Sequence, residues 1–400
     1  MTFFEELKWR GLVKDISSPD LEEKLNNESL TFYWGTDPTA DSLHLGHYSS
    51  LVTAKRLMLH GHKPILLVGG ATGLIGDPRP TAEREIISKE TVEKNIEGLK
   101  RQVTRLLDNK AEVVNNYDWT KNVTFLDFLR DIGKYINVNY MLNKDIISRR
   151  LESGITYAEF SYTLLQGFDF LHLFKNKNCT LQAAGSDQWG NITTGIELIR
   201  KIEGVEAYGF TMPLILDKTG KKFGKSEGNA LWLDKEKTSP YLIYQYLLNS
   251  DDSKVIEYLK VFTFLNKEEI DALEKKVKTE PEKREAQKTL AYEVVKDLHG
   301  VEEAEKAKKT SEEVFTKGYS SEGMPSETIE YKDNMNLMDI LVMTKITTSK
   351  SEARRLIIGN GISVNNEKEL NPERIFTKEE INDLIISKGK KTHIKVNLVK

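Results

Sequence analysis

Short apolar runs alternate with helix-length segments through residues 1–235, and this alternation constrains the fold more than any other feature of the chain. The runs are bounded by Gly, Pro, Asn or Asp, which predicts strands at Thr31–Trp34, Pro64–Val68, Glu112–Asn115, Thr180–Ala183 and Phe210–Leu216. Helical patterns between them include Gly46–His60, Thr91–Leu107 and Ile192–Ile202. Strands that alternate with helices favour a doubly wound sheet of parallel strands, the α/β class. Ligands bind such sheets at the carboxyl ends of the strands, so we expect the chemistry in the loops that follow them.

The sequence changes character beyond residue 235. Leu, Ile, Tyr and Val recur at helical spacing among many Glu and Lys residues, as in Ser239–Leu248 and Lys283–Leu298, which predicts packed helices. A stretch rich in Gly, Ser and acidic residues then indicates a linker. We therefore predict four parts: a Rossmann-like α/β domain over 1–235, an α-helical domain over 236–320, a linker at 321–333 and a small α+β domain over 334–400.

Charge limits the class of protein. The 400 residues include 61 Asp and Glu against 58 Lys and Arg, a net charge of −3, which excludes a uniformly basic nucleic-acid coat but allows a local basic face. From Lys332 onward, 13 Lys and Arg stand against 9 Asp and Glu, and a basic tail on an acidic body is expected of a nucleic-acid contact. A solvated surface with a chance imbalance of charge explains the same count.

The rest of the composition indicates a soluble intracellular protein. No apolar run approaches the ~18 residues that span a bilayer, so we expect no membrane segment. The opening segment contains acidic residues, unlike a secretory signal or a transit peptide. The single cysteine, Cys179, cannot form an intrachain disulfide and leaves too few thiols for a thiolate zinc site. These features predict a cytoplasmic protein.

A turn and a helix start follow the first predicted strand. Pro38 and its Thr, Asp and Ser neighbours favour the turn, and His44-Leu45-Gly46-His47 begins the helix. Gly46 has no side chain, so a purine or a ribose can lie against the backbone there. The helix N-terminus and the two imidazoles can face a phosphate chain. Paired histidines at this spacing also serve as caps or surface residues, which leaves both interpretations open.

A second basic motif, Lys221-Lys222-Phe223-Gly224-Lys225-Ser226, follows the last predicted strand of the α/β domain. Lysines in a flexible loop can reach triphosphate oxygens as charge accumulates on them, which stabilises a transition state. An exposed basic turn without function is the alternative for this motif taken alone.

Three polar residues, Tyr162, Gln166 and Asp169, recur at i, i+4 and i+7 and therefore share one face of a predicted helix. Their neighbours are apolar, which indicates that this helix is buried. Buried polar groups need partners, and these are either one another or a ligand. A purely structural hydrogen-bond network remains open at this point.

The motif Gly185-Ser186-Asp187-Gln188-Trp189-Gly190 follows the strand at Thr180–Ala183. Its glycines permit close backbone approach, and the carboxylate of Asp187 can accept hydrogen bonds from ribose hydroxyls. A turn in which Asp187 caps the next helix is the alternative, and one aspartate can serve both purposes.

The motifs together resemble a known family. HLGH and KFGKS are similar to the HIGH and KMSKS signatures of class I aminoacyl-tRNA synthetases. The ordered segments YWGTDPTADSLHLGH, GGATGLIGDP, YTLLQGFDF, GSDQWGN and KFGKS resemble bacterial-type tyrosyl-tRNA synthetases, densely over 1–235 and less specifically beyond. The resemblance implies ATP-dependent attachment of L-tyrosine to tRNA(Tyr), through a tyrosyl-adenylate, with release of pyrophosphate and then AMP. It implies no nucleophile on the protein, because positioning and charge stabilisation carry the reaction.

The resemblance also implies roles for single residues. In the tyrosine site, Tyr33 and Asp169 contact the phenolic hydroxyl, Tyr162, Gln166 and Asp77 hold the ammonium group, and Gln188 lies near the carboxyl group. In the ATP site, Thr39, His44, Lys222 and Lys225 contact the β and γ phosphates, Arg84 clamps a further phosphate, and His47, Ser50, Gly46, Gly185 and Asp187 surround the nucleoside. ATP is a substrate that arrives with Mg²⁺, and we expect no dedicated protein metal site.

Three departures from the family pattern concern the ATP site. The loop from Asp77 to Arg84 is short and lacks a lysine that is often present there in the family, and Arg79 can substitute for that lysine. Trp34 stands where a small residue is common and crowds the approach to the ribose, and Thr36 replaces a usual Phe. None of these changes removes a group that the chemistry requires.

The tail carries the remaining predictions. The segment SKSEARRLIIGNGISVNNEKE resembles an RNA-binding module like that of ribosomal protein S-four, with a helix that turns into a strand at Ile362–Val364. Lys350, Arg354 and Arg355 share one side of that helix, which suits phosphate contacts with tRNA. The aromatic stretch Trp119–Met141 is interpreted as core, or as the interface of a homodimer like those of the family.

Other functions fit part of the sequence. A different nucleotidyl transferase with the same HxGH fold, or a tryptophan-type synthetase, shares the nucleotide signatures, although the phenol-binding pair Tyr33 and Asp169 favours tyrosine. An RNA-binding or splicing cofactor that has lost catalysis is a non-enzyme alternative. The presence of His44, Lys222 and Lys225 argues against it.

Overall fold

The chain folds into two compact units. The computed structural model describes residues 1–78, 87–226, 229–317, 326–365, 367–382, 384–389 and 392–399. One unit comprises Met1–Asp234 with Lys260–Phe262, and the other comprises Lys235–Leu259 with Thr263–Lys400. Within the described ranges, no helix is both long and apolar enough to cross a bilayer.

The first unit is built on a six-stranded sheet with the order β1-β6-β5-β2-β3-β4. Its strands are β1 (Asp15–Ile16), β2 (Thr31–Thr36), β3 (Lys63–Val68), β4 (Glu112–Asn115), β5 (Cys179–Gly185) and β6 (Tyr208–Met212). Only the short edge strand β1 runs antiparallel to its neighbour, and the other pairs are parallel. The predicted doubly wound α/β fold is confirmed. The last predicted strand was placed wrongly, because Pro213, which has no N–H to donate, follows directly after Met212 and β6 ends there.

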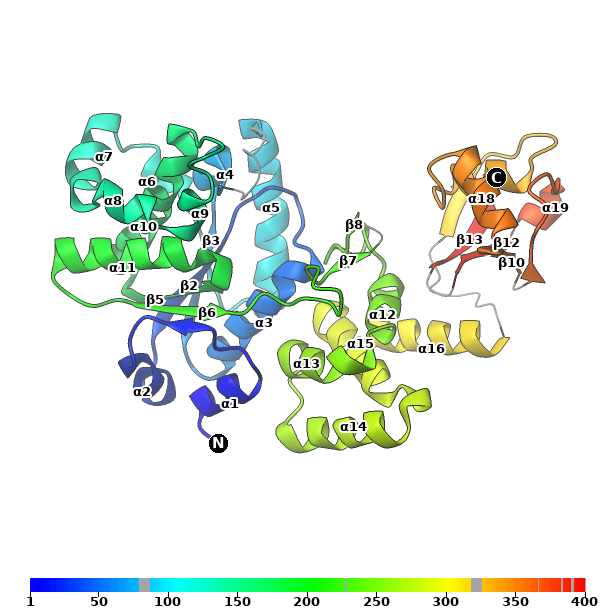
Figure 1. The fold of residues 1–400 in the computed structure, drawn as a ribbon, viewed down its shortest axis with the longest axis horizontal. Coiled ribbons are helices and arrows are strands. Elements are labelled where there is room, and N and C mark those ends of the chain that lie inside the picture. The colour runs from blue at the N-terminus through cyan, green and yellow to red at the C-terminus, as the bar shows by residue number, and fades with distance from the viewer. Residues whose placement is uncertain are drawn as a thin grey trace. The chain divides into compact units, whose positions relative to one another are not determined.

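Strand order reverses between β2 and β5, and this reversal fixes where a ligand can bind. From β2 the chain moves outward through α3 (Leu45–Leu59) to β3, and through α5 (Lys89–Leu106) to β4. It then returns through α10 (Tyr157–Lys177) to β5 and through α11 (Trp189–Glu203) to β6. Right-handed crossovers in opposite directions put α3 and α5 on one face and α10 and α11 on the other, as Figure 1 shows. The carboxyl ends of β2 and β5 therefore flank the crevice expected of this fold.

Shorter elements complete the first unit. They are α1 (Phe3–Trp9), α2 (Asp20–Asn27), α4 (Thr72–Ile75), α6 (Tyr117–Thr120), α7 (Phe125–Asp131), η1 (Gly133–Tyr135), α8 (Val138–Leu142), α9 (Asp145–Ser148), η2 (Ser186–Gln188), β7 (Lys225–Ser226) and β8 (Asn229–Ala230). The predicted helices at 46–60, 91–107 and 192–202 correspond to α3, α5 and α11, each within three residues at both ends.

The second unit begins with packed helices, as the Leu- and Glu-rich pattern predicts. They are α12 (Pro240–Leu248), α13 (Asp252–Phe262), α14 (Lys267–Thr279), η3 (Pro281–Lys283), α15 (Glu285–His299) and α16 (Val301–Lys317). The last three residues of α13 belong to the first unit. Phe262 there stacks on Phe223 and on Tyr48, with ring centroids 4.7 Å and 5.9 Å apart.

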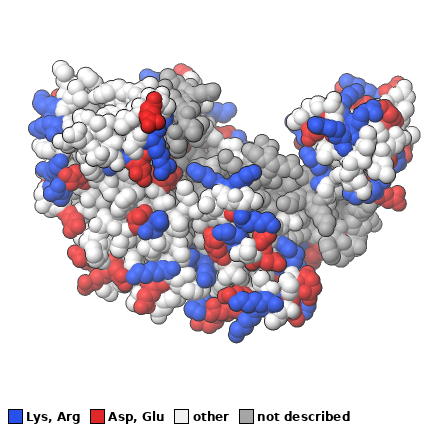
Figure 2. All heavy atoms as spheres, in the orientation of Figure 1, with Lys and Arg blue, Asp and Glu red and all other residues white. Residues whose placement is uncertain are grey.

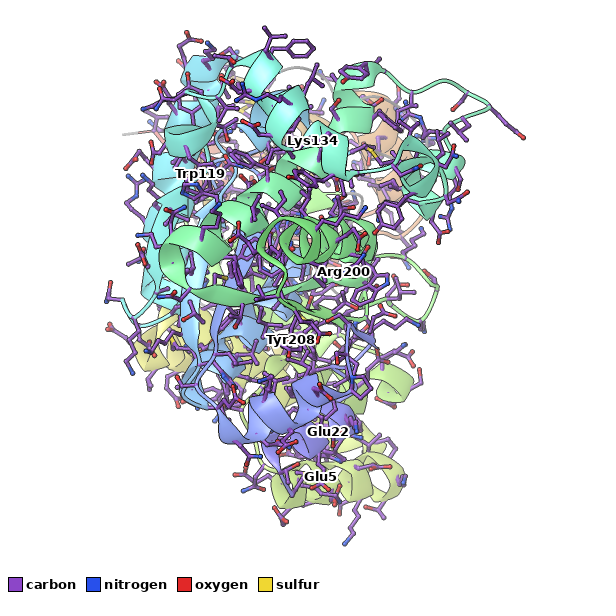
Figure 3. The ribbon with its side chains drawn as sticks, turned by 90° about the vertical axis from the view of Figure 1, so that its left-hand side faces the viewer. Glu5, Glu22, Trp119, Lys134, Arg200 and Tyr208 are labelled. Carbon is purple, nitrogen blue, oxygen red and sulfur yellow. The ribbon has the colours of Figure 1, made fainter. Side chains whose placement is uncertain are left out.

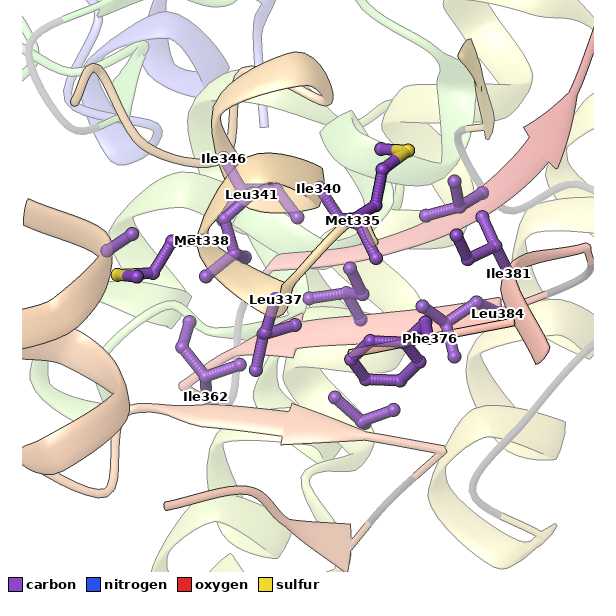
Figure 4. Packing of buried hydrophobic residues seen from close by; sticks show 14 of the residues in the cluster. Met335, Leu337, Met338, Ile340, Leu341, Ile346, Ile362, Phe376, Ile381 and Leu384 are labelled. Carbon is purple, nitrogen blue, oxygen red and sulfur yellow. The ribbon is translucent and has the colours of Figure 1, made fainter. Parts of the chain in front are cut away.

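The tail forms a five-stranded sheet covered by helices around its own apolar core (Figure 4). Its elements are β9 (Ser326–Ile329), α17 (Leu337–Met343), α18 (Lys350–Ile358), β10 (Ile362–Val364), β11 (Glu367–Lys368), α19 (Lys378–Ile381), β12 (Leu384–Lys388) and β13 (Thr392–Leu398). The predicted strand Ile362–Val364 matches β10. Part of the predicted linker is wrong, because Ser326–Ile329 pairs in parallel with the last strand and belongs to the tail sheet. An exposed, acidic edge strand has few apolar residues, which is why composition alone suggested a linker.

Candidate active site

The first signature motif forms the beginning of α3, at the carboxyl end of β2. His44 is the N-cap, and its Nδ1 accepts a hydrogen bond from the amide of Gly46 at 3.1 Å. The backbone amide of His44 in turn donates to Nδ1 of His47, and the two imidazole rings stack with centroids 3.8 Å apart. The alternative interpretation of these histidines as caps therefore describes the contacts that they make in the structure. Both rings remain partly exposed at a helix N-terminus.

The second signature motif packs directly against the first. Gly224 has a φ of +88°, and a Cβ at this position would lie 2.6 Å from the backbone nitrogen of Gly46. Backbone hydrogen bonds close the same contact, because the amide of Leu45 donates to the carbonyl of Leu231, and the amide of Leu231 donates to the carbonyl of Gly224. HLGH and KFGKS, almost 180 residues apart in sequence, thus meet through their backbones, and a glycine is required where they touch.

Three other predicted ATP residues are exposed. Lys222 and Thr39 are exposed, and Asp187 is exposed next to Gly185, where an added Cβ would lie 2.8 Å from the Asp187 carboxylate. Asp187 does not cap α11, whose N-cap is Gln188 without a side-chain hydrogen bond. The alternative role of Asp187 as a cap of that helix is therefore wrong.

Trp34 has a partner in this region. Its indole Nε1 donates to Oγ of Ser50 at 3.0 Å, so the bulky residue holds the hydroxyl that was expected beside the ribose. Thr36, at the end of β2, is half-buried. Arg79 and Arg84 lie outside the described residues, as does the side chain of Lys225.

The predicted polar face of α10 is buried and meets Tyr33 from β2. Asp169 is 2 % exposed, and its two carboxylate oxygens accept hydrogen bonds from Nδ2 of Asn116 and Nε1 of Trp119, both at 2.9 Å. Burial raises the pKa of Asp169 to about 7, although the two donors oppose this shift. A carboxylate in this position is poised to accept a further hydrogen bond from a ligand.

The hydroxyl of Tyr33 is the unusual group of the site. Its oxygen is buried and has no hydrogen-bond partner among the residues that the structure describes. Burial raises the pKa of Tyr33 well above its ordinary value, and the charge of Asp169 raises it further. A buried hydroxyl without a partner costs about 1–3 kcal/mol, and such groups in native proteins usually await a ligand or a water molecule.

A second group of polar side chains lies around Tyr162. Its hydroxyl donates to Oδ2 of Asp37 at 2.9 Å, while Oδ1 of Asp37 accepts from Thr72 at 2.7 Å. Burial raises the pKa of Tyr162 well above its ordinary value, and the nearby charges of Asp37, Asp77 and, more weakly, Asp169 add to this. Three carboxylates around one buried phenol create a negative potential that favours a cationic group of a ligand.

Asp77, whose charge acts on Tyr162, is hydrogen-bonded to Gln188. Nε2 of Gln188 donates to Oδ2 of Asp77 at 2.9 Å, and Asn191 bridges the two side chains by donating to both. Gln166 is half-buried and makes no hydrogen bond to any residue within the described ranges. The structure thus brings Tyr33, Asp169, Tyr162, Gln166, Asp77 and Gln188 into one region at the switch point of the sheet.

Sequence reasoning missed five residues that hold this site together. They are Asp37, Thr72, Asn116, Trp119 and Asn191. All except Thr72 contact a predicted site residue, and Thr72 donates a hydrogen bond to Asp37. Asp37 and Asn116 directly follow strands β2 and β4, so their position after a parallel strand was an available signal. Trp119 carried no such signal, because an aromatic stretch is more often core. No group of three or more His, Cys, Asp or Glu side chains among the described residues can hold a metal ion.

Comparisons with known proteins agree with this geometry. A parallel sheet whose switch point joins HLGH to KFGKS defines a class I aminoacyl-tRNA synthetase. The family model "tRNA synthetases class I (W and Y)" matches residues 25–316, and the model of the tyrosine–tRNA ligase SYY-like C-terminal domain matches residues 316–396. The chain belongs to the tryptophan and tyrosine branch of the class I tRNA synthetases.

The most similar relatives carry one activity in their names. Tyrosine–tRNA ligase 1 of Bacillus subtilis is 46 % identical over 414 residues, and the tyrosine–tRNA ligase of Bacillus pumilus is 47 % identical over 414 residues, each match covering 98 % of both chains. Among solved structures, a C-terminally truncated mitochondrial tyrosyl-tRNA synthetase of Coccidioides posadasii is 33 % identical with a TM-score of 0.69. That match covers 77 % of this chain and 91 % of the other.

Proposed function

We propose that this chain is a tyrosine–tRNA ligase that uses the site described above. It joins L-tyrosine to tRNA(Tyr) at the expense of ATP, in two steps. The observation that carries the assignment to tyrosine is the buried hydroxyl of Tyr33, which has no partner among the described residues and lies within the electrostatic reach of Asp169. A bound phenol completes both groups, since it can donate to the carboxylate of Asp169 and accept from Tyr33.

The chemistry needs no nucleophile from the protein. The carboxylate of tyrosine attacks the α-phosphorus of ATP, the bond to the bridging oxygen breaks, and pyrophosphate leaves. A terminal ribose hydroxyl of tRNA then attacks the acyl carbon of tyrosyl-adenylate, and AMP leaves. The protein accelerates both steps by holding the reactants in line and by stabilising the charge that develops on phosphate oxygens.

The proposed residues form two groups, one for tyrosine and one for ATP. Tyr162, Gln166 and Asp77 hold the ammonium group of tyrosine in the negative potential of the carboxylates, and Gln188 lies near its carboxyl group. His44, Thr39, Lys222, Lys225 and Arg84 contact the phosphates, while His47, Ser50, Gly46, Gly185 and Asp187 surround the nucleoside. Mg²⁺ arrives on the phosphates of ATP, because hard cations prefer phosphate oxygens.

Selectivity against phenylalanine follows from the same buried pair. Without a phenol, the buried hydroxyl of Tyr33 stays without a partner among the described residues, which costs about 1–3 kcal/mol. The indole of tryptophan offers no acceptor for the hydroxyl of Tyr33. A tryptophan-specific enzyme of the same branch is therefore the weaker candidate.

The tail is proposed to bind tRNA through α18. Ala353 and Ile357 of this helix are buried in the tail core, and Lys350, Arg354 and Arg355 are exposed. Lys350 forms an ion pair with Asp339 at 2.6 Å, and Arg354 forms one with Glu373. Arg355 has no ion-pair partner in the described ranges, so it is the side chain most available to a phosphate.

We also propose a cytoplasmic homodimer. Four apolar side chains on α7 and α8 are exposed, namely Phe125, Leu126, Leu129 and Val138, with Phe125 67 % and Leu126 74 % accessible. Figure 2 has few charged atoms in the upper left, where Figure 1 places α7. α7 also carries Asp127, Arg130 and Asp131, whose side chains are exposed, and Arg130 forms an ion pair with each aspartate. The exposed apolar side chains favour burial against a second copy, since two copies related by a twofold axis present the same surface to each other. The proposed domains are 1–235, 236–320 and a tail domain that begins at β9 and so extends the predicted 334–400 toward the N-terminus.

Pyrophosphate exchange tests the proposed function directly. The purified chain is incubated with ATP, labelled pyrophosphate, Mg²⁺ and each of the twenty amino acids in turn. We expect exchange with tyrosine alone. Exchange with tryptophan or with no amino acid would reject the assignment, and a complete lack of exchange by a folded protein would favour the non-catalytic RNA-binding alternative.

A further inference from the structure

Three stacked aromatic rings join the two signature motifs. Phe262, the last residue of α13, is buried and belongs to the first unit. Its ring centroid lies 4.7 Å from that of Phe223 and 5.9 Å from that of Tyr48, with interplanar angles of 24° and 5°. Tyr48 directly follows HLGH, and Phe223 is the aromatic residue of KFGKS. A residue from outside both motifs therefore contacts the second motif and the residue next to the first.

The buried ring of Phe223 determines the direction of the lysine next to it. Lys222 pairs with Leu216 in an antiparallel bridge, and the amide of Phe223 donates to the carbonyl of Ile215 at 3.0 Å. The backbone is therefore extended here, and neighbouring side chains of an extended backbone point to opposite sides. Because Phe223 packs inward, Lys222 points outward, and it is exposed. The ring stack thus fixes the side of the loop from which Lys222 projects.

The end of α13 that carries Phe262 is anchored by two arginines. The last carbonyls of a helix have no partners within the helix. Nη1 of Arg10 donates to the carbonyl of Lys260 at 3.0 Å, and Nη2 of Arg56 donates to that of Val261 at 3.1 Å. Both arginines are buried, and cations are favourable at the C-terminus of a helix. Arg56 lies on α3, so the helix that HLGH begins also holds the segment that carries Phe262.

Arg10 is itself held in place at the end of α1. Its Nε donates to Glu6 of the same helix at 2.6 Å. Lys8 of α1 forms an ion pair with Glu22 of α2 at 2.9 Å. Figure 3 shows these two helices next to each other, marked by Glu5 and Glu22. The support of the ring stack therefore extends from α3 to the first two helices of the chain.

The loop of KFGKS is held by backbone contacts and by the ring stack. The backbone contact at Gly224 fixes how closely the loop approaches Gly46. A loop can still rotate about such a point, because Gly224 has no side chain to interlock with its surroundings. The stack of Phe223 on Phe262 supplies a second point and removes this freedom. Lysines that stabilise charge in a transition state are most effective when they are fixed before the reaction begins.

We propose that Phe262 is a positioning residue for the activation of tyrosine. Its ring holds Phe223 so that Lys222 and Lys225 meet the phosphates of ATP at the N-terminus of α3. This role rests on the proposed function of these two lysines. It affects the rate of the reaction and not the affinity for tyrosine, because the hydrogen bonds of Asp169 come from other residues.

Pyrophosphate exchange by the full-length chain tests this role through Phe262→Leu, which keeps an apolar side chain and removes the ring. We expect kcat to fall at least about tenfold at saturating tyrosine and ATP. The dissociation constant of tyrosine, measured by calorimetry, should stay within about twofold of its original value. Val255→Ala is the matched control, because it shortens another buried side chain of α13 two turns earlier, and it should keep kcat. An unchanged kcat in Phe262→Leu, or a loss of rate that is matched by a loss of tyrosine affinity, would overturn the proposal.

A double-mutant cycle identifies the contact. Phe223→Leu breaks the same stack from the loop side and should lower kcat by a similar factor. Phe262→Leu combined with Phe223→Leu should be about as slow as either single variant, because one substitution already breaks the contact. Losses that multiply, to about 100-fold, would overturn the proposal. If Phe262→Leu does not fold, an unchanged kcat in Phe223→Leu overturns it.

Hydrogen exchange of backbone amides tests the positioning without the reaction. The amides of Phe223 and Leu231 donate to the carbonyls of Ile215 and Gly224, both at 3.0 Å. In Phe262→Leu these two amides should exchange at least about tenfold faster than in the unmodified chain, and in the control variant they should not. Equal protection in Phe262→Leu and the unmodified chain would overturn the proposal. An unmodified chain without tyrosine-dependent pyrophosphate exchange would refute the proposed function, and amide exchange would still decide whether Phe262 holds the loop.

Discussion

Tyrosine binding should depend on pH through the ionisation of Asp169. The phenol of tyrosine donates to a carboxylate, and in the unliganded protein burial raises the pKa of Asp169 to about 7. Below that pH the free protein carries a proton on Asp169, and the strong acceptor is lost. The apparent affinity is reduced by the fraction of molecules in the ionised form.

The magnitude follows from that value. With a pKa of about 7, about one-tenth of molecules are ionised at pH 6 and about nine-tenths at pH 8. Tyrosine should therefore bind about tenfold more weakly at pH 6 than at pH 8, a difference of about 1.4 kcal/mol. Calorimetric titration without ATP is the appropriate assay, because the histidines of the proposed ATP site then do not contribute.

Two variants assign the effect to Asp169. Asp169→Asn should bind tyrosine weakly and without the tenfold change. Trp119→Phe removes a donor that lowers the pKa of Asp169, so its midpoint should move above pH 7. His172→Phe is the control for the imidazole that stacks on the indole of Trp119, and it should keep the profile. A flat profile between pH 6 and pH 8 in the unmodified chain, or a tenfold change that persists in Asp169→Asn, would refute the reasoning.

The remaining predictions concern stability and RNA binding. Tyr33→Phe removes a buried hydroxyl that has no partner among the described residues, so it should raise the free energy of unfolding by about 1–3 kcal/mol. The same variant should bind tyrosine severalfold more weakly. A lower free energy of unfolding than that of the unmodified chain would contradict this. Gly224→Ala should lower the melting temperature and the pyrophosphate-exchange rate more than Gly220→Ala does. Both glycines have a positive φ, but of the two only Gly224 contacts α3. Equal effects of the two substitutions would contradict the close contact. Between about pH 4 and pH 7 the folded chain retains a proton on Asp169 that the unfolded chain releases, so the chain should lose stability with rising pH relative to Asp169→Asn, by up to about 4 kcal/mol in denaturant unfolding. Arg355→Gln should raise KM for tRNA and reduce the salt dependence of binding by about one ion without changing pyrophosphate exchange.

The sequence alone was sufficient for the fold class and for the grouping of the polar side chains on α10. Alternating strands and helices determine a doubly wound sheet, because each buried strand needs a crossover helix to reach its parallel neighbour. HLGH and GSDQWGN were predicted to follow strands, and in the structure HLGH follows β2 and GSDQWGN begins at the end of β5. The i, i+4, i+7 spacing of Tyr162, Gln166 and Asp169 placed them on one helix face. Each of these patterns involves residues that are close together in the sequence, so a single sequence is enough to detect it.

The boundaries of two strands were predicted wrongly, because the residues around them do not show where the strand ends or what it pairs with. Pro213 ends β6 before the apolar run ends, and the acidic, exposed strand β9 looks like a linker because it gains its hydrogen bonds from a strand more than sixty residues away. Turn residues and apolar runs give no information on which distant strand a segment pairs with.

Only the tertiary structure decided which polar groups are satisfied. Asp169 receives its hydrogen bonds from Asn116 and Trp119, which are 53 and 50 residues away, and Tyr33 receives none from the described chain. The shifted pKa of Asp169 has the same origin. Desolvation depends on all the atoms that surround a group, and those atoms come from segments that lie far apart in the sequence.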